Sequence, residues 1–323
     1  MRQTALFLFF TLAAYSQKPE LAIVEKKAGK VGFYTAAGQR VGEVKVGSFP
    51  HELAWTPDRK HLYVTDNGLL WMTDPGEGTN SISIVDPYRM TKVGIIDLGQ
   101  YRRPHGLDVD RTGRIVVTIE NPFGMLTIDG AARKVLRKYD VKGENPHMVI
   151  YGPDARTAWV SNSTSGNVAV VDLASGAVQT IATGKRTQGA VMTRDGKRMY
   201  VTNSASQTIS ANDTATRKVV GEIKVSQPGA ARIAMTPDEK TLVYNLQQWG
   251  GAAIADIASM KEIAAIKIPG KPLSAGLSRD GKVMFLGLQD EDKIAVVSVT
   301  ERKLVQVFET PKNAGPDTIF DLR

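Results

Sequence analysis

Three of the four histidines in this 323-residue chain directly follow a proline, and these are His51, His105 and His147. They lie 54 and 42 residues apart, and each precedes a short apolar run. Neutral imidazole is a good ligand for Zn, Cu, Fe or Ni, and imidazole also exchanges protons near neutral pH. Histidines repeated in this way predict a metal centre or an acid–base site, provided that the fold brings them together.

A repeated unit must position these histidines. In each unit an apolar strand leads into a tight turn, and a second apolar strand follows. The equivalent turn residues are Asp58, Thr112, Asp154, Asp195, Asp238 and Asp280. A period near 42 residues, with about four short strands per unit, is typical of a β-propeller blade.

Six complete units run from residue 50 to about residue 315, and the two ends of the chain supply a seventh. Residues 21–24, 30–35 and 40–46 are expected to form three strands that lack the first strand of a unit, and residues 316–322 supply that strand. The sequence therefore predicts an all-β, seven-bladed β-propeller of four-stranded antiparallel blades. Its last blade is closed by the N- and C-terminal strands, which removes exposed strand edges.

Residues 1–16 have the features of a signal peptide, with Arg2, the apolar residues 5–14, and small residues at Ala14 and Ser16. An uncleaved anchor is the alternative, although ten apolar residues fall short of the roughly 20 that span a bilayer. We expect residues 17–323 to form a single propeller domain. We expect this mature chain to be periplasmic or secreted and monomeric, without a membrane span.

The amino-acid composition excludes several kinds of chemistry and partner. The chain has no cysteine, which excludes disulfides, thiolate metal ligands and a Cys nucleophile. The formal net charge is +8, but its Lys and Arg residues form no run longer than two. A solvated basic surface is the expected reading of this charge, and binding of nucleic acid or a cell-wall polymer is the alternative.

Two rings of residues are predicted at one end of the propeller. The residue seven positions before each turn residue begins the first strand, and this ring includes His51, His105 and His147. In the closing blade Pro316 matches the prolines of the other blades, so Asp317 takes this place. The residue eight positions after each turn residue ends the second strand, and this ring includes Asp66, Glu120 and Asn162. The sequence thus predicts imidazoles backed by polar and acidic groups along one arc.

Two further features lie near this arc. The loop over residues 67–80 makes the first unit about twelve residues longer than the next, and it carries Trp71 and Met72 at its tip. Long loops at a binding face often act as lids, so Trp71 is expected either to cover the mouth or to pack on the adjacent blade. Arg103, just before His105, is expected either to receive an anionic ligand or to form a solvated pair with Arg102.

The strands Tyr63-Val64-Thr65-Asp66 and Tyr200-Val201-Thr202-Asn203, with their Thr-Pro-Asp turns and Val-Asp strand ends, give the chain a family resemblance. It resembles the YVTN-repeat family of seven-bladed β-propellers, whose repeats are WD40-like. This resemblance covers nearly all of the mature chain and implies the fold strongly. It implies chemistry weakly, because similar blades occur in exported proteins, lactonase-like enzymes and streptogramin lyases.

Three functions follow as hypotheses. The first is an exported binding or scaffold protein of the cell envelope, whose partner is a small molecule at the channel mouth or an envelope protein. The second is a metal-assisted hydrolase or lyase, in which His51, His105 and His147 hold one divalent metal ion and His105 and Glu120 are catalytic candidates. The third is polyanion binding.

A purely structural role is the alternative for the histidines, because each could hydrogen-bond the backbone of the next blade. The chain contains no nucleophile elbow, phosphate-binding glycine loop or dinucleotide fingerprint. Whether the protein is an enzyme stays open at this point.

Overall fold

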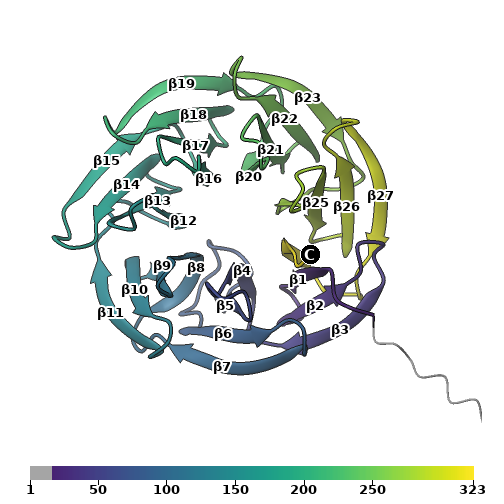
Figure 1. Ribbon diagram of the computed structural model, residues 1–323, viewed down its shortest axis with the longest axis horizontal. Helices are drawn as coiled ribbons and strands as arrows, with labels where there is room; N and C mark the ends of the chain where they lie inside the picture. Colours follow the sequence, from purple (N-terminus) through teal and green to yellow (C-terminus); the bar gives the residue numbers. More distant parts are fainter. Residues whose placement is uncertain (1–16) are drawn as a thin grey trace, which may run out of the picture.

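The computed structural model describes residues 17–323 as 28 strands in seven four-stranded antiparallel sheets. The sheets are arranged as blades around a central axis (Figure 1), which confirms the predicted seven-bladed propeller. Within this described range there is no helix, and so none that could cross a membrane. The signal peptide predicted for residues 1–16 lies outside the described residues.

Each blade has its first strand at the central axis and its fourth at the rim. From the axis outward, blades one to four consist of β4 (Pro50–Trp55), β5 (Leu62–Asp66), β6 (Ser81–Asp86) and β7 (Thr91–Asp97); β8 (Arg102–Val109), β9 (Arg114–Asn121), β10 (Phe123–Asp129) and β11 (Lys134–Tyr139); β12 (Pro146–Tyr151), β13 (Thr157–Asn162), β14 (Asn167–Asp172) and β15 (Val178–Ala182); and β16 (Thr187–Met192), β17 (Arg198–Asn203), β18 (Thr208–Asp213) and β19 (Lys218–Lys224). Blades five to seven consist of β20 (Ala230–Met235), β21 (Thr241–Leu246), β22 (Gly251–Asp256) and β23 (Lys261–Lys267); β24 (Gly276–Leu277), β25 (Val283–Leu288), β26 (Lys293–Ser298) and β27 (Lys303–Glu309); and β28 (Pro316–Asp321), β1 (Leu21–Glu25), β2 (Lys30–Tyr34) and β3 (Arg40–Lys45).

Blade seven joins the two ends of the described chain. Strand β28 pairs antiparallel with β1, in a register that sets Leu21 opposite Asp321 and Ile23 opposite Ile319. The C-terminal strand thereby becomes the inner strand of a blade whose other strands come from the N-terminal part. This confirms the closure predicted from the incomplete units at the ends of the chain.

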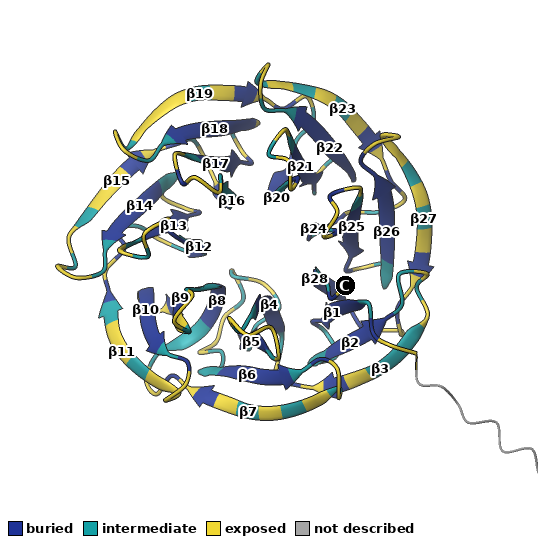
Figure 2. Ribbon diagram, in the orientation of Figure 1, coloured by how far each residue is buried: buried dark blue, intermediate teal, exposed yellow. Residues whose placement is uncertain are grey.

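The core is divided among the interfaces between blades. Seven apolar clusters each join two neighbouring blades, and the cluster between blades one and two includes Tyr63, Ile84, Leu107 and Ile119. The inner three strands are therefore buried on both faces, whereas the outer strands alternate buried and exposed residues (Figure 2). This explains the near-continuous apolar runs of the inner strands.

Buried hydroxyls on the second strands connect consecutive blades around the axis. The Thr65 hydroxyl accepts a backbone N–H from β4 and donates to the carbonyl of His105 in blade two, at 2.9 Å. The Thr118 hydroxyl does the same between β8 and the carbonyl of His147 in blade three, also at 2.9 Å. The backbone of each of these two histidines is thus fixed by its preceding blade.

Candidate functional site

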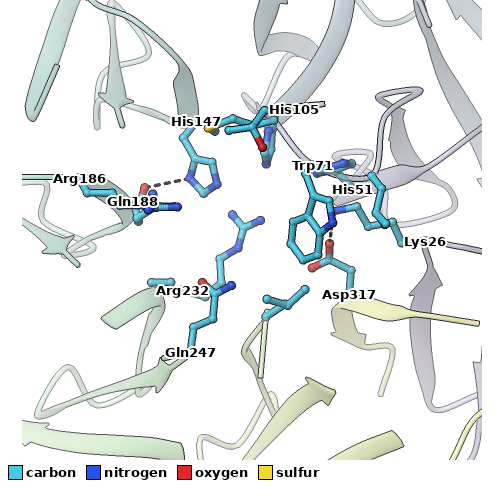
Figure 3. Close-up of a pocket in the computed structure, with 15 residues that line it drawn as sticks. Lys26, His51, Trp71, His105, His147, Arg186, Gln188, Arg232, Gln247 and Asp317 are labelled. Carbon is cyan, nitrogen blue, oxygen red and sulfur yellow. Dashed lines mark hydrogen bonds and ion pairs between the residues drawn. The ribbon is translucent and has the colours of Figure 1, made fainter. Parts of the chain in front are cut away.

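A cavity of about 170 Å³ lies at one end of the central axis, which we call the mouth (Figure 3). All seven blades contribute to its lining. The polar and aromatic side chains in the lining are Lys26, His51, Trp71, Thr73, His105, His147, Arg186, Gln188, Arg232, Gln247 and Asp317. The structure therefore gathers four of the predicted first-ring residues, together with Trp71, around one small space.

The three imidazoles form a row across blades one to three. The ring centres of His51 and His105 are 4.5 Å apart, those of His105 and His147 are 4.4 Å apart, and both pairs meet edge to face. All three side chains are buried. The row follows from the fold, because His51, His105 and His147 occupy the same position on β4, β8 and β12.

The two outer imidazoles of the row, those of His51 and His147, each have one nitrogen facing a backbone carbonyl. Nε2 of His51 lies 3.2 Å from the carbonyl oxygen of Leu69, and Nδ1 of His147 lies 3.3 Å from that of Gln188. A carbonyl can only accept, so these two nitrogens carry the proton and donate. Nδ1 of His51 and Nε2 of His147 are left as acceptors.

The central imidazole is held by a carboxylate. Nδ1 of His105 lies 2.7 Å from Glu120 Oε1, and Arg103 Nη2 lies 2.8 Å from Glu120 Oε2. The Arg103 guanidinium favours the ionised form of Glu120, so Nδ1–H of His105 donates and Nε2 keeps its lone pair. Arg103 also donates to the carbonyl of Met72, at 2.6 Å, and so links the blade-one loop to this pair.

Burial lowers the pKa of all three mouth histidines well below the ordinary value. Nearby charge acts in the same direction, since Lys26 is the next cause for His51 and Arg232 is the next for His105. Burial raises the pKa of Glu120, and the Arg103 guanidinium acts in the opposite direction. The imidazoles are therefore neutral near pH 7, and each offers one acceptor nitrogen.

The predicted alignment of blade two was wrong by one residue after its first turn. In blade two the turn is capped by Asp110, whose carboxylate accepts the N–H of Thr112 and Arg114. Thr112 follows Asp110 by two residues as Asp58 follows Thr56, but Arg114 ends this turn one residue earlier than His61 ends the turn of blade one. Pro104 consequently pairs with Ile119, whereas Pro50 pairs with Asp66.

Because of this shorter turn, Glu120 does not occupy the predicted position on its strand. It corresponds to Asn67 rather than to Asp66, so it lies one residue further along the second strand than the other members of the second ring. That extra residue turns its carboxylate to the mouth side, where it meets His105.

None of the three predicted second-ring residues lines the cavity, and only Glu120 contacts a mouth histidine. The Asp66 carboxylate accepts the backbone N–H of Gly47 and the hydroxyls of Ser81 and Ser83, each at 2.8 Å. Asn162 donates to the carbonyl of Val141, at 3.0 Å, on the connection between blades two and three. Both side chains bind the chain within or beside their own blade, so the structure does not bring them to the histidines.

The blade-one loop reaches over the mouth. Leu70, Trp71, Met72 and Thr73 all line the cavity, and the Trp71 ring lies 5.6 Å from Lys26 Nζ. Of the two predicted placements for Trp71, the structure therefore has the one that covers the mouth. Arg103 is buried against Glu120, and it is not half of a solvated pair with Arg102, which instead contacts the exposed Glu77.

Three cations line the mouth without occupying a position of either predicted ring, and these are Lys26, Arg186 and Arg232. Arg186 stands two residues before Gln188, as Arg103 stands two residues before His105, and both have a positive φ. Arg232 follows the mouth position of blade five directly, as Glu52 follows His51. Extending each ring by these neighbouring positions would have found all of them except Lys26.

Two of these three cations, Lys26 and Arg232, have a carboxylate partner. Lys26 Nζ lies 3.2 Å from Asp317 Oδ2, and both side chains are buried. Burial lowers the pKa of Lys26, and Asp317 acts in the opposite direction. Arg232 pairs with the buried Glu52 across the axis. Arg186 has no carboxylate partner within residues 17–323.

His51, His105 and His147 were predicted to hold one divalent metal ion. Among the residues that the structure describes, no group of three or more His, Cys, Asp or Glu side chains is arranged to hold a metal ion. The three rings meet edge to face. One nitrogen of each ring has a protein partner, which orients the ring and leaves its other nitrogen free. A divalent metal on His51, His105 and His147 stays a prediction, which metal analysis of the purified protein tests.

Comparison with known proteins identifies relatives of several kinds. Protein NirF of Pseudomonas aeruginosa PAO1 is 26% identical over 196 residues, which is 57% of this chain and 50% of NirF. The chain thus matches about half the length of that relative.

Solved structures share the fold at low sequence identity. A functionally unknown protein from Desulfotomaculum acetoxidans DSM 771 has a TM-score of 0.78 at 14% identity, covering 94% of this chain and 98% of that one. The periplasmic gluconolactonase PpgL of Pseudomonas aeruginosa has a TM-score of 0.75 at 16% identity, covering 94% and 99%. The dihydro-heme d1 dehydrogenase NirN, in complex with DHE, has a TM-score of 0.66 at 14% identity, covering 96% and 78%. At these identities the likeness shows the fold alone.

A family model settles the relationship. The model described as a YNCE-like beta-propeller matches residues 11–322, which is nearly the whole chain. This agrees with the seven blades of the structure and with the resemblance to YVTN-repeat propellers. The chain belongs to the YNCE-like β-propeller family.

Proposed function

We propose that this protein is an exported binding protein that holds a small anionic molecule at the mouth. The charge of the cavity lining carries the proposal. Lys26, Arg186 and Arg232 face the cavity with a single carboxylate, that of Asp317. Glu52 is the partner of Arg232 but does not line this cavity, and Arg186 has no carboxylate partner in residues 17–323.

A bound anion would neutralise this excess positive charge of the cavity lining. Arg guanidinium groups bind carboxylates and phosphates through two parallel N–H donors, and such bonds are stronger in a partly enclosed site. The neutral imidazoles add hydrogen-bonding capacity without adding charge. The small volume of the cavity favours a ligand of few atoms over a polymer.

Calorimetric titration with acetate, propionate, succinate and inorganic phosphate tests the proposal. We expect at least one of these anions to bind, and Arg186→Met to weaken that binding about tenfold, which corresponds to about 1.4 kcal/mol. Arg156→Met is the matched control, because Arg156 is exposed at the turn between β12 and β13, outside the cavity lining. Equal weakening in both variants, or no binding of any anion, contradicts the proposal.

Acid–base catalysis is the second candidate, and the contact of His105 with Glu120 favours it. The Nε2 lone pair of His105 would accept a proton from water as that water attacks an ester or lactone carbonyl. Lys26 and Arg232 would stabilise the resulting oxyanion. A periplasmic gluconolactonase shares this fold.

Hydrolysis of small lactones by the wild-type protein tests this candidate. His105→Gln is expected to abolish turnover, and Glu120→Gln is expected to lower kcat and change the pH profile. Turnover that persists in His105→Gln would contradict the candidate.

Export is part of the proposal and rests on the composition of residues 1–16. N-terminal sequencing of the protein recovered from its native cell should begin at Gln17. An intact residue 1 would contradict cleavage. Binding to nucleic acid, the remaining alternative, is expected to disappear by about 0.5 M salt if it rests on the net charge alone.

A further inference from the structure

We propose that the ligand of the mouth is a small hydroxycarboxylate, an anion that also presents a hydroxyl donor. This inference rests on the proposed function above and names the chemical class of its ligand. Its starting point is Asp317, which is 3% exposed and lines the cavity (Figure 3). Oδ2 of Asp317 pairs with Lys26, whereas Oδ1 is buried and has no hydrogen-bond partner within residues 17–323.

A buried carboxylate oxygen without a partner is costly unless something donates to it. Asp317 is on β28, at the position that the histidines occupy on β4, β8 and β12, so its carboxylate belongs to the lining itself. A ligand that brings an N–H or O–H group to Oδ1 would complete its hydrogen bonding. A ligand without such a group would leave Oδ1 unpaired and further from water.

The imidazoles add acceptors of the same kind. One nitrogen of each ring is engaged with Leu69, Glu120 or Gln188, which leaves one lone pair on each ring. The uncharged polar groups of the lining are therefore weighted toward acceptors along blades one to three. Acceptors of this kind select ligands that carry donors, because a ligand without donors leaves them unsatisfied.

The donor is a hydroxyl rather than an ammonium. Lys26 already contacts Asp317, and Arg186 and Arg232 line the same cavity. A ligand ammonium brought to Asp317 would be repelled by these three cations, whereas a hydroxyl would not. Burial is the main cause of the lowered pKa of His51 and His105, and the charges of Lys26 and Arg232 lower it further.

The carboxylate of the ligand is expected to bind at Arg232 and Arg186. The guanidinium of Arg232 extends to the middle of the mouth (Figure 3). Its partners are Glu52 and the thioether of Met148, which is a weak acceptor. A ligand carboxylate at Arg232 and Arg186 would leave the hydroxyl end of the same molecule toward Asp317, and a cavity of about 170 Å³ suits an acid of a few carbons.

Calorimetry with matched acids tests the inference. Glycolate is compared with acetate, and 3-hydroxypropionate with propionate and β-alanine, whose ammonium replaces the hydroxyl. We expect wild-type protein to bind the hydroxy acid of at least one pair tenfold or more tightly than its deoxy partner, and to bind β-alanine no more tightly than propionate. Equal affinities within both pairs would overturn the inference and leave anion binding standing. Failure of every acid to bind would overturn the proposed function, and tighter binding of β-alanine would overturn the choice of hydroxyl.

Asp317→Asn assigns the discrimination to this carboxylate. Lys26 would hold the amide oxygen, which places the amide NH₂ where Oδ1 was and removes the free acceptor. The preference for the hydroxy acid should fall to less than threefold, while the deoxy acid binds at least as tightly as before. Asp290→Asn is the control for net charge, since Asp290 is exposed and its ion-pair partner within residues 17–323 is Lys27. A preference retained in Asp317→Asn would overturn the role of Asp317.

Discussion

Each mouth imidazole has one nitrogen held by a fixed acceptor, and this governs the chemistry of single residues at the site. The acceptors are two backbone carbonyls and the carboxylate of Glu120. Glu120 in turn is held by Arg103, so the central ring is oriented by two further side chains. Such an arrangement fixes which nitrogen carries the proton and leaves the opposite nitrogen available to a ligand.

The stability of the protein should therefore fall as the pH drops below about 6.5, the ordinary pKa of an unfolded histidine. The native pKa values of the mouth histidines are well below this, so in this window the unfolded chain binds protons that the native state excludes. Each such histidine costs up to about 1.4 kcal/mol of unfolding free energy per pH unit. Burial also raises the pKa of Glu52 and Glu120, which contributes in the opposite sense at lower pH.

Comparison of wild-type protein with His147→Gln isolates the histidine contribution, because the carboxylates are common to both. Urea unfolding between pH 5 and pH 7 should show a shallower loss of stability in the variant. Parallel curves for the two proteins would contradict the burial of a neutral imidazole at this position.

At the scale of an element, the loop between β5 and β6 closes the mouth. Its tip residues line the cavity, and it is tied to the blade-two site by Arg103, which donates to the carbonyl of Met72. Residues 68–80 of this loop are all half-buried or exposed, so its opening is expected to be easier than any opening of the blades. This makes the loop the expected route for a ligand.

Trp71→Ala should speed the dissociation of a bound anion about tenfold and change its association rate less. The variant removes the indole that covers Lys26 and lines the cavity, and it leaves the blades untouched. Stopped-flow displacement gives both rates. Trp249→Ala is the matched control, because Trp249 also lies beside a lysine, Lys267, but does not line the cavity. Similar dissociation from both variants would mean that the loop does not retain the ligand.

At the scale of the whole molecule, closure of blade seven holds the ring together. Strand β28 supplies the inner strand of that blade and contributes Ile319 to the cluster between blades six and seven. It also carries Asp317 into the mouth. One strand thus completes the sheet, the core and the site.

Deletion of residues 316–323 should abolish cooperative thermal unfolding or cause aggregation, because it exposes the edge of β1 and opens the apolar cluster. Calorimetry and size-exclusion chromatography measure these outcomes. Deletion of Arg323 alone is the control, since this exposed terminal residue contacts Asp321 and Arg279 outside the cluster. An unchanged melting temperature after the longer deletion would contradict closure by β28.

The amino-acid sequence by itself determined the repeat and therefore the fold. Strand pattern, turn chemistry and a period near 42 residues are local properties, and only a closed ring pairs the incomplete units at the two ends. The same period placed His51, His105, His147 and Asp317 at equivalent positions. Their meeting at one mouth follows from equivalence on the inner strands.

Only the tertiary structure decided which other groups join them. A turn shorter by one residue moved Glu120 to His105, and a register change of this size alters where a side chain points. Lys26, Arg186 and Arg232 come from blades seven, four and five, and they meet only because the ring closes around one axis. Burial and the nearby cations lower the pKa of the mouth histidines. The same packing leaves Asp317 Oδ1 without a partner. Both outcomes depend on distances across the axis, which no local sequence pattern records.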